Sequence, residues 1–135
     1  AATAIALYEQ YGRDYPYAFN RKEAKDHGEG GTIVGAALTG RVLVIDDVMT
    51  AGTAIREAAS IVANQGAELA GVAIALDRQE RGTGEQSAVQ EVQSRYGVPV
   101  INIVSLQEIS THIQQSTTDA DLLTRIQAYR QQYGV

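Results

Sequence analysis

Short apolar runs alternate along the chain with stretches that have the pattern of helices. The runs lie at residues 41–45, 69–76 and 98–104, and the helical stretches that follow them lie at 53–65, 86–96 and 105–114. A helix between two strands is the usual crossover that joins parallel strands. The alternation therefore predicts an α/β fold, in which a parallel sheet is flanked by helices.

The residues before the first run predict a helix, a short strand and a loop. Residues 1–11 are rich in alanine and end at Gly12, which is a typical helix stop. Residues 15–19 are rich in aromatic side chains and favour a short strand. The polar, glycine-containing segment 20–32 predicts a mobile loop, because glycine adds backbone freedom.

Two further helices are expected near the C-terminus, each with a capping box at its start. Ser105 with Glu108 predicts the first helix, and Thr118 with Asp121 predicts the second. We interpret both helices as scaffold. Because 135 residues is the length of about one domain, we expect a single domain over residues 1–135.

The composition restricts the partners and the cellular compartment that we expect for this protein. The formal net charge of −5 disfavours sequence-independent binding to nucleic acid or to anionic membranes. The chain has no cysteine, which fits a reducing compartment and means that any metal would need oxygen ligands. The apolar runs are too short to cross a membrane, so we expect a soluble, cytoplasmic protein. The chain begins at Ala1 without Met and already in helical composition, so we expect it to be the C-terminal part of a longer protein.

The run at residues 41–45 is followed directly by two acids, Asp46 and Asp47, and then by a small turn with hydroxyl groups at Thr50 and Thr53. Ligands of open α/β sheets bind at the carboxyl edge of the strands, where these residues are expected. The backbone N–H groups of the turn would converge at the start of the next helix, a geometry that suits a phosphate monoester. The alternative is that the two acids cap the loop and that Thr53 caps the helix.

Other kinds of phosphate site fit the sequence less well. The chain has neither G-x-x-x-x-G-K-[ST] nor a G-x-G-x-x-G after a strand, which disfavours NTPase and dinucleotide sites. A two-component receiver domain also has paired acids at a strand end, and Asp77 would be its phospho-acceptor. Such a domain needs a lysine after a later strand, where this chain has Ser105.

Both lysines of the chain, Lys22 and Lys25, lie in the predicted loop, close to Arg21 and His27. Cations on a loop with glycine hinges are what closure over a polyphosphate requires. We therefore predict that this loop closes over a phosphorylated ligand. The alternative is an ordinary solvated surface loop, since charged runs usually face water.

Arg78 follows the run at residues 69–76 and is expected at the same sheet edge as Asp46. Its guanidinium group can hydrogen-bond a planar ligand that carries carbonyl or anionic groups. The alternative is an ion pair between Arg78 and Asp77 or Glu80.

Four segments resemble the type I phosphoribosyltransferases, and among them the subgroup that acts on orotate. Residues 44–53, Val-Ile-Asp-Asp-Val-Met-Thr-Ala-Gly-Thr, resemble the family's binding motif for phosphoribosyl diphosphate. Residues 20–30 are similar to the flexible catalytic loop of the orotate subgroup, and residues 76–81 and 128–135 resemble the same subgroup. The family's N-terminal portion, which carries the hood over the base, is missing from this sequence.

The resemblance implies a Rossmann-like sheet and a transferase reaction. Ribose 5-phosphate would pass from 5-phosphoribosyl 1-diphosphate to orotate, giving orotidine 5′-monophosphate and diphosphate, with Mg²⁺ carried by the diphosphate. A homodimer is implied, in which the loop reaches the neighbouring subunit's site. Another type I phosphoribosyltransferase and a non-catalytic nucleotide-sensing domain are the alternatives.

The resemblance also implies a role for each candidate residue, with no side chain binding the metal directly. Catalysis is assigned to Lys25, His27, Asp46 and Asp47. Orotate is expected to contact Thr50 and Arg78. The residues expected to bind phosphoribosyl diphosphate are Arg21, Lys22, Lys25, His27, Asp46, Asp47, Val48, Met49, Thr50, Ala51, Gly52, Thr53 and Ala54.

Overall fold

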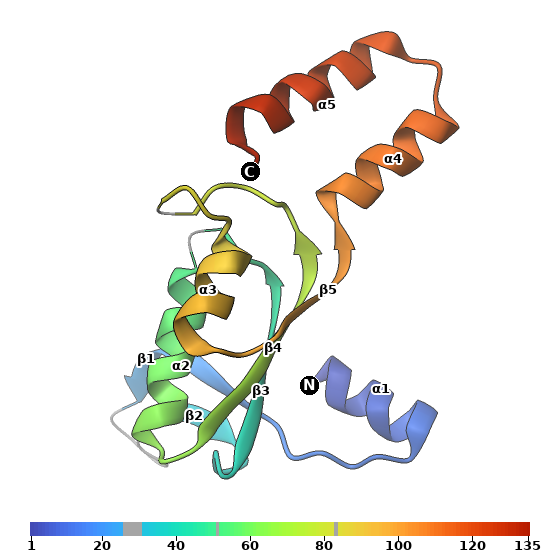
Figure 1. Ribbon diagram of the computed structural model, residues 1–135. Coiled ribbons are helices and arrows are strands. Elements are labelled where there is room, and N and C mark those ends of the chain that lie inside the picture. Colours follow the sequence, from blue (N-terminus) through green and yellow to red (C-terminus); the bar gives the residue numbers. More distant parts are fainter. Residues whose placement is uncertain (26–30, 51, 83) are drawn as a thin grey trace. The chain divides into compact units, whose positions relative to one another are not determined.

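The computed structural model describes residues 1–25, 31–50, 52–82 and 84–135 (Figure 1). These residues form two compact units, Ala1–Leu38 and Thr39–Val135. None of the side chains described in the first unit is buried. The single domain expected over residues 1–135 stays a prediction.

The first unit consists of a helix and a β-hairpin. The helix, α1 (Ala2–Tyr11), ends at Gly12 in the left-handed region at φ 61°, which confirms the predicted helix and its stop. Strand β1 (Ala18–Lys25) pairs antiparallel with β2 (Gly31–Gly35). The aromatic strand predicted over 15–19 therefore starts only at Ala18.

The hairpin also replaces much of the loop predicted over residues 20–32. Residues 20–25 belong to β1, and β2 begins at Gly31. Antiparallel pairing satisfies the backbone N–H and C=O groups whatever the side chains are, so a polar stretch can form a strand that its composition does not predict. Residues 26–30, with His27 among them, lie outside the described residues.

Three parallel strands form the sheet of the second unit, which confirms the predicted fold class. They are β3 (Arg41–Val48), β4 (Glu68–Asp77) and β5 (Val100–Ser105), in the order β3-β4-β5. Val48 near the end of β3 pairs with Leu76 near the end of β4. Residues that follow these two strands therefore start from neighbouring points on one edge of the sheet.

The helices of the second unit agree closely with the predicted ranges. They are α2 (Thr53–Asn64), α3 (Ala88–Tyr96), α4 (Leu106–Ser116) and α5 (Ala120–Tyr133). Figure 1 shows α2 and α3 on one face of the sheet, and α4 continuing directly from β5. No helix in the described part of the chain is long and apolar enough to cross a membrane.

The core lies between one face of the sheet and the helices α2 and α3. Val72 and Ile74 of β4, Ile55 of α2 and Val92 of α3 are each no more than 3% exposed. Burying a side chain of this size contributes about 1.5–3 kcal/mol, so these contacts hold the strands and helices together. Since α2 starts directly after β3, this packing also positions the turn between them.

Side-chain caps start the last three helices. Ser87 and Gln90 form a capping box for α3, and Ser105 and Glu108 form the box predicted for α4. Hydrogen bonds from the Ser105 hydroxyl and N–H lower the pKa of Glu108, because they favour the charged carboxylate.

The cap predicted for α5, Thr118 with Asp121, is wrong. Asp119 caps that helix, and its Oδ1 accepts a hydrogen bond from the Leu122 N–H at 3.1 Å. Thr and Asp are both good cap residues, so the sequence alone does not separate the two positions. The hydroxyl of Thr117 accepts from the Asp119 N–H at 3.2 Å, which fixes the chain one residue further on.

Candidate functional site

The end of β3 presents two carboxylates that are held by their own backbone. Asp46 is half-buried and Asp47 is exposed, since successive strand residues face opposite sides of the sheet. The N–H of Asp47 donates to Oδ1 of Asp46 at 2.9 Å, and the N–H of Val48 donates to Oδ1 of Asp47 at 2.7 Å. Within the described residues, Oδ2 of each aspartate accepts no hydrogen bond. The local capping that we considered as an alternative is thus present, and it leaves one oxygen of each carboxylate open to a ligand.

The turn between β3 and α2 leaves the start of the helix without a side-chain cap. Gly52 occupies the cap position at φ 65°, and Thr53 is the first helical residue, so Thr53 does not cap the helix. Instead, the Thr53 hydroxyl accepts from Nη2 of Arg56 at 2.9 Å. The first N–H groups of an uncapped helix are available to an anion.

The remaining residues of the predicted phosphate turn divide between core and surface. Met49 is buried in the core at 6% exposure, and Val48 is half-buried. Thr50 and Ala54 are exposed. Ala51 lies outside the described residues. Met49 therefore anchors the turn, while Thr50 is accessible to a ligand.

The predicted loop cations lie in the first unit. Arg21 is half-buried on β1, and the backbone of Lys22 and Lys25 continues the same strand. Asp46 and Asp47 belong to the second unit. Closure of the hairpin over the aspartates stays a prediction from the sequence.

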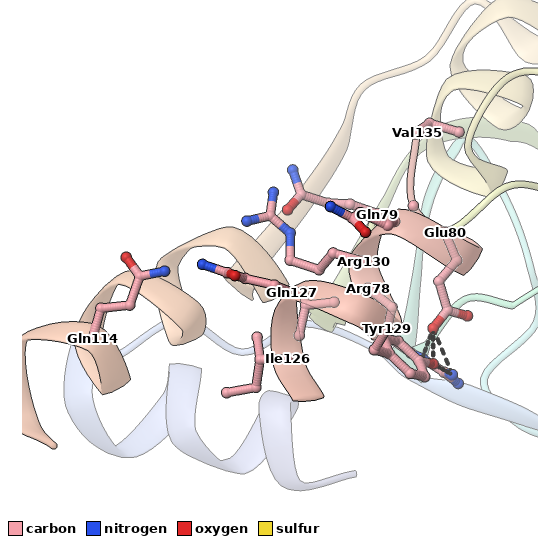
Figure 2. Close-up of a pocket in the computed structure, with 12 residues that line it drawn as sticks. Arg78, Gln79, Glu80, Gln114, Ile126, Gln127, Tyr129, Arg130 and Val135 are labelled. Carbon is pink, nitrogen blue, oxygen red and sulfur yellow. Dashed lines mark hydrogen bonds and ion pairs between the residues drawn. The ribbon is translucent and has the colours of Figure 1, made fainter. Parts of the chain in front are cut away.

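Arg78, the first residue after β4, is held by two partners (Figure 2). Its Nε donates to Oε1 of Glu80 at 2.9 Å, and its Nη2 lies 2.7 Å from the same oxygen. Nη2 also donates to the hydroxyl of Tyr129 at 2.7 Å. These bonds raise the pKa of Arg78, chiefly through Tyr129, so its charge is fixed at any working pH.

The ion pair with Glu80 confirms one of the alternatives that we considered for Arg78. It does not use up the guanidinium group. In the part of the chain that the structure describes, Nη1 has no hydrogen-bond partner, and the side chain is 35% exposed. Asp77 pairs elsewhere, because its Oδ1 accepts from the Gln79 N–H at 2.8 Å.

Residues 3–108 match the phosphoribosyl transferase domain family. The chain belongs to that family. It is 62% identical over 135 residues to an orotate phosphoribosyltransferase of Thioalkalivibrio sulfidiphilus, and 59% identical over 135 residues to one of Pseudomonas aeruginosa. In both cases the whole of this chain matches 63% of the relative's length.

Solved structures of phosphoribosyl transferase domains agree with the fold. The crystal structure of orotate phosphoribosyltransferase from Francisella tularensis superposes with a TM-score of 0.83 at 35% identity, over 99% of this chain and 63% of that one. UMP synthase of Leishmania donovani shares the fold alone, with a TM-score of 0.71 at 22% identity, over 96% of this chain and 26% of that one. The resemblance to the phosphoribosyltransferases noted from the sequence is thereby confirmed.

Glu80 was one of the partners considered for Arg78 from the sequence, but the sequence did not identify Tyr129 as the other group that holds Arg78 in this phosphoribosyl transferase domain. We interpreted the last helix as scaffold, whereas its Tyr129 bonds to Arg78 and donates a short hydrogen bond to Glu80. Tyr129 lies 51 positions after Arg78, and no local pattern links two residues so far apart. A pocket of about 290 Å³ opens beside these residues, between the end of β4, α4 and α5.

Proposed function

We propose that this chain functions in an orotate phosphoribosyltransferase, which transfers ribose 5-phosphate from phosphoribosyl diphosphate to N1 of orotate. The observation that carries the proposal is its identity of about 60%, over the full length of the chain, to several proteins of that name. The arrangement at the carboxyl edge of the sheet supports it, because carboxylates, an uncapped helix start and an arginine lie on neighbouring strand ends.

Asp46 and Asp47 would hold the ribose hydroxyls through their open Oδ2 oxygens. Their negative charge would stabilise an oxocarbenium-like ribose as the bond to diphosphate breaks, without a covalent intermediate. The 5-phosphate would accept hydrogen bonds from the N–H groups at the start of α2. The bond between N1 and C1′ would form as the bond from C1′ to diphosphate breaks. The N1 proton of orotate would pass to the leaving diphosphate or to water, so neither aspartate has to move a proton.

The leaving diphosphate would be neutralised by Mg²⁺ and by Arg21, Lys22, Lys25 and His27. No group of three or more His, Cys, Asp or Glu residues that could hold a metal lies in the described part of the chain. Proteins usually bind Mg²⁺ through one or two carboxylates, and phosphate oxygens of the substrate complete the coordination shell. We propose that the ion arrives on the diphosphate and that its charge assists departure of that group.

Orotate would lie between Thr50 and Arg78. Thr50 is exposed at the end of β3, and Nη1 of Arg78 is open at the end of β4. We further propose a cytoplasmic enzyme, with which a chain without cysteine is compatible.

The reaction is tested by mixing the protein that carries this chain with orotate, phosphoribosyl diphosphate and Mg²⁺ and following the absorbance of orotate. We expect loss of orotate with equimolar formation of diphosphate. Turnover of a purine base or of uracil in place of orotate would identify another phosphoribosyltransferase. Binding of phosphoribosyl diphosphate without turnover of any base would identify a sensing domain.

We also propose a homodimer in which the hairpin of one subunit serves the other subunit's site. Lys25→Ala and Asp47→Asn chains would then carry complementary faults, and mixing them would restore one sound site in each mixed dimer. Equal mixing makes about half of the dimers mixed, so about a quarter of the wild-type activity should return. Recovery no greater than the parents' average, with subunit exchange demonstrated, would place the hairpin in its own subunit's site.

A further inference from the structure

We propose that Tyr129 is a positioning residue for the base: its hydroxyl holds the Arg78 guanidinium so that Nη1 faces orotate. The inference rests on the proposed function, because it names how the arginine of that site is oriented. It concerns a residue on the last helix, far from the phosphoribosyl diphosphate motif in the sequence.

Three polar groups form a closed triangle at this point (Figure 2). Arg78 donates through Nη2 to the Tyr129 hydroxyl at 2.7 Å and through Nε to Oε1 of Glu80 at 2.9 Å. The Tyr129 hydroxyl in turn donates to the same Oε1. Each member therefore bonds to the other two, and the guanidinium plane is fixed at two of its three nitrogens.

The backbone beneath Arg78 is held as firmly as its side chain. Gln79 adopts φ 52°, in the left-handed region that a residue with a side chain rarely occupies. Three hydrogen bonds support it: its N–H donates to Asp77, its side-chain Oε1 accepts from the Gln107 N–H at 2.9 Å, and its C=O accepts from the Val135 N–H at 3.1 Å. The turn that carries Arg78 is thus tied to α4 and to the residues after α5.

A second set of contacts ties the end of α5 to the same turn. The N–H of Arg81 donates to the carbonyl of Tyr133 at 2.9 Å, and its Nε donates to the carbonyl of Gly134 at 3.2 Å. Because the chain just after Tyr129 is anchored to this turn, the phenol approaches Arg78 from a fixed point.

The consequence for binding is a matter of preorganisation. An arginine that is free in solution loses rotamer freedom when it binds a ligand, and that loss weakens binding. Here the loss has already occurred on folding, and the open Nη1 is presented in one direction. Removal of the Tyr129 hydroxyl should therefore weaken the binding of the ligand that contacts Arg78 and leave the binding of other ligands unchanged.

The test is Tyr129→Phe in the protein that carries this chain, with Tyr133→Phe as the matched control. The Tyr133 ring packs against Tyr129 at 4.8 Å between centroids, and in the described part of the chain its hydroxyl has no hydrogen-bond partner. Both variants lose one phenolic oxygen from the same helix, but only one touches Arg78. Melting temperatures establish that each variant is folded.

We expect Tyr129→Phe to raise the Kd and the KM for orotate about five- to tenfold, which is less than the loss of a direct hydrogen bond to a charged group, because the hydroxyl acts only through Arg78. The KM for phosphoribosyl diphosphate should stay within about twofold, and Tyr133→Phe should match the wild type. In an Arg78→Ala background, Tyr129→Phe should add nothing, because the group that it orients is gone. Glu80→Gln changes another member of the same three hydrogen-bonded groups, and it should also weaken the binding of orotate selectively.

Different negative results separate the inference from the proposed function on which it rests. If the wild type does not use orotate, or if Arg78→Ala leaves orotate binding unchanged, the proposed site and the inference both fall. If Arg78→Ala weakens orotate and Tyr129→Phe does not, the inference alone is wrong. Two other results are that Tyr129→Phe weakens the binding of both substrates equally, or that it has the same effect with and without Arg78. Either result would show that Tyr129 has only a structural role and would overturn the inference.

Discussion

The carboxyl ends of β3 and β4 are neighbours in one sheet, yet they are built in different ways. At the end of β3, the hydrogen bonds of Asp46, Asp47 and Thr53 reach no further than three positions along the chain. At the end of β4, Arg78 and Gln79 also have local bonds to Glu80 and Asp77, but further bonds to Arg78, Gln79 and Arg81 span 51, 28 and 53 positions. The first site is made by consecutive residues, and the second is assembled from the two ends of the unit.

The comparison teaches where each site is vulnerable. A site made by consecutive residues needs only the strand and helix that carry it, so changes in α5 should leave it intact. A site assembled from distant elements is lost when any one of them is displaced. The four predictions below, which apply to the protein that carries this chain, test whether the two strand ends behave so differently.

The largest effect is expected at the end of β3. Asp47→Asn and Asp46→Asn should each lower kcat by about 100-fold or more, because charge near the reacting ribose is lost without added bulk. Activity assays measure kcat, and melting temperatures establish that each variant is folded. Glu57→Gln, on the exposed side of α2, is the control for loss of one negative charge and should retain full activity. Wild-type kcat in both aspartate variants would exclude the β3 end from the reaction.

Arg78→Ala should act on the other side of the comparison. We expect the Kd for orotate to rise about 10- to 100-fold, since the lost hydrogen bonds come from a charged donor. The Kd for phosphoribosyl diphosphate should change little. Arg125→Ala removes an equal charge from an exposed position of α5 and serves as the control. Equal losses for both substrates would show that the two strand ends do not divide the ligands as proposed.

Gly52→Ala tests the local turn by itself. A side chain at φ 65° costs about 1–2 kcal/mol, and the added Cβ would lie 3.3 Å from Nη1 of Arg56 and 3.6 Å from Val92. Gly66→Ala is the matched control, with φ 73° and nothing within 4 Å of its added Cβ. Denaturant unfolding should show a greater loss in the free energy of unfolding for Gly52→Ala than for Gly66→Ala. Only Gly52→Ala should weaken the binding of phosphoribosyl diphosphate. Identical losses would mean that the approach at Gly52 has no energetic consequence.

The smallest effect concerns the start of α4, next to Gln107, which supports the β4 end. The folded-state pKa of Glu108 is lowered from 4.5, so the capping box stabilises the protein above that pH and loses its effect as the pH falls through the lowered pKa. Glu108→Gln should therefore lower the melting temperature slightly at pH 7 and have less effect at the acid end of the range in which the protein stays folded. A difference from wild type that does not shrink with falling pH would contradict this assignment.

The sequence by itself determined those parts of the protein that depend on neighbouring residues. The alternation of strand and helix patterns predicts the parallel sheet, because a helix between two strands is the usual crossover that joins parallel strands. Asp46, Asp47 and Thr53 are recognisable for the same reason, since the hydrogen bonds described for them have their partners within one short segment. The capping box of Ser105 and Glu108 is equally local.

Only the tertiary structure decided the features whose partners are distant or equivalent. The hairpin strand through Lys25 depends on pairing with β2, which composition does not report. Asp119 and Thr118 are both suitable caps, and the contact with Thr117 selects between them. The orientation of Arg78 depends on Tyr129, and that contact forms only when α5 packs beside the end of β4. Distant partners meet through packing of the whole unit, so no short stretch of sequence encodes where they meet.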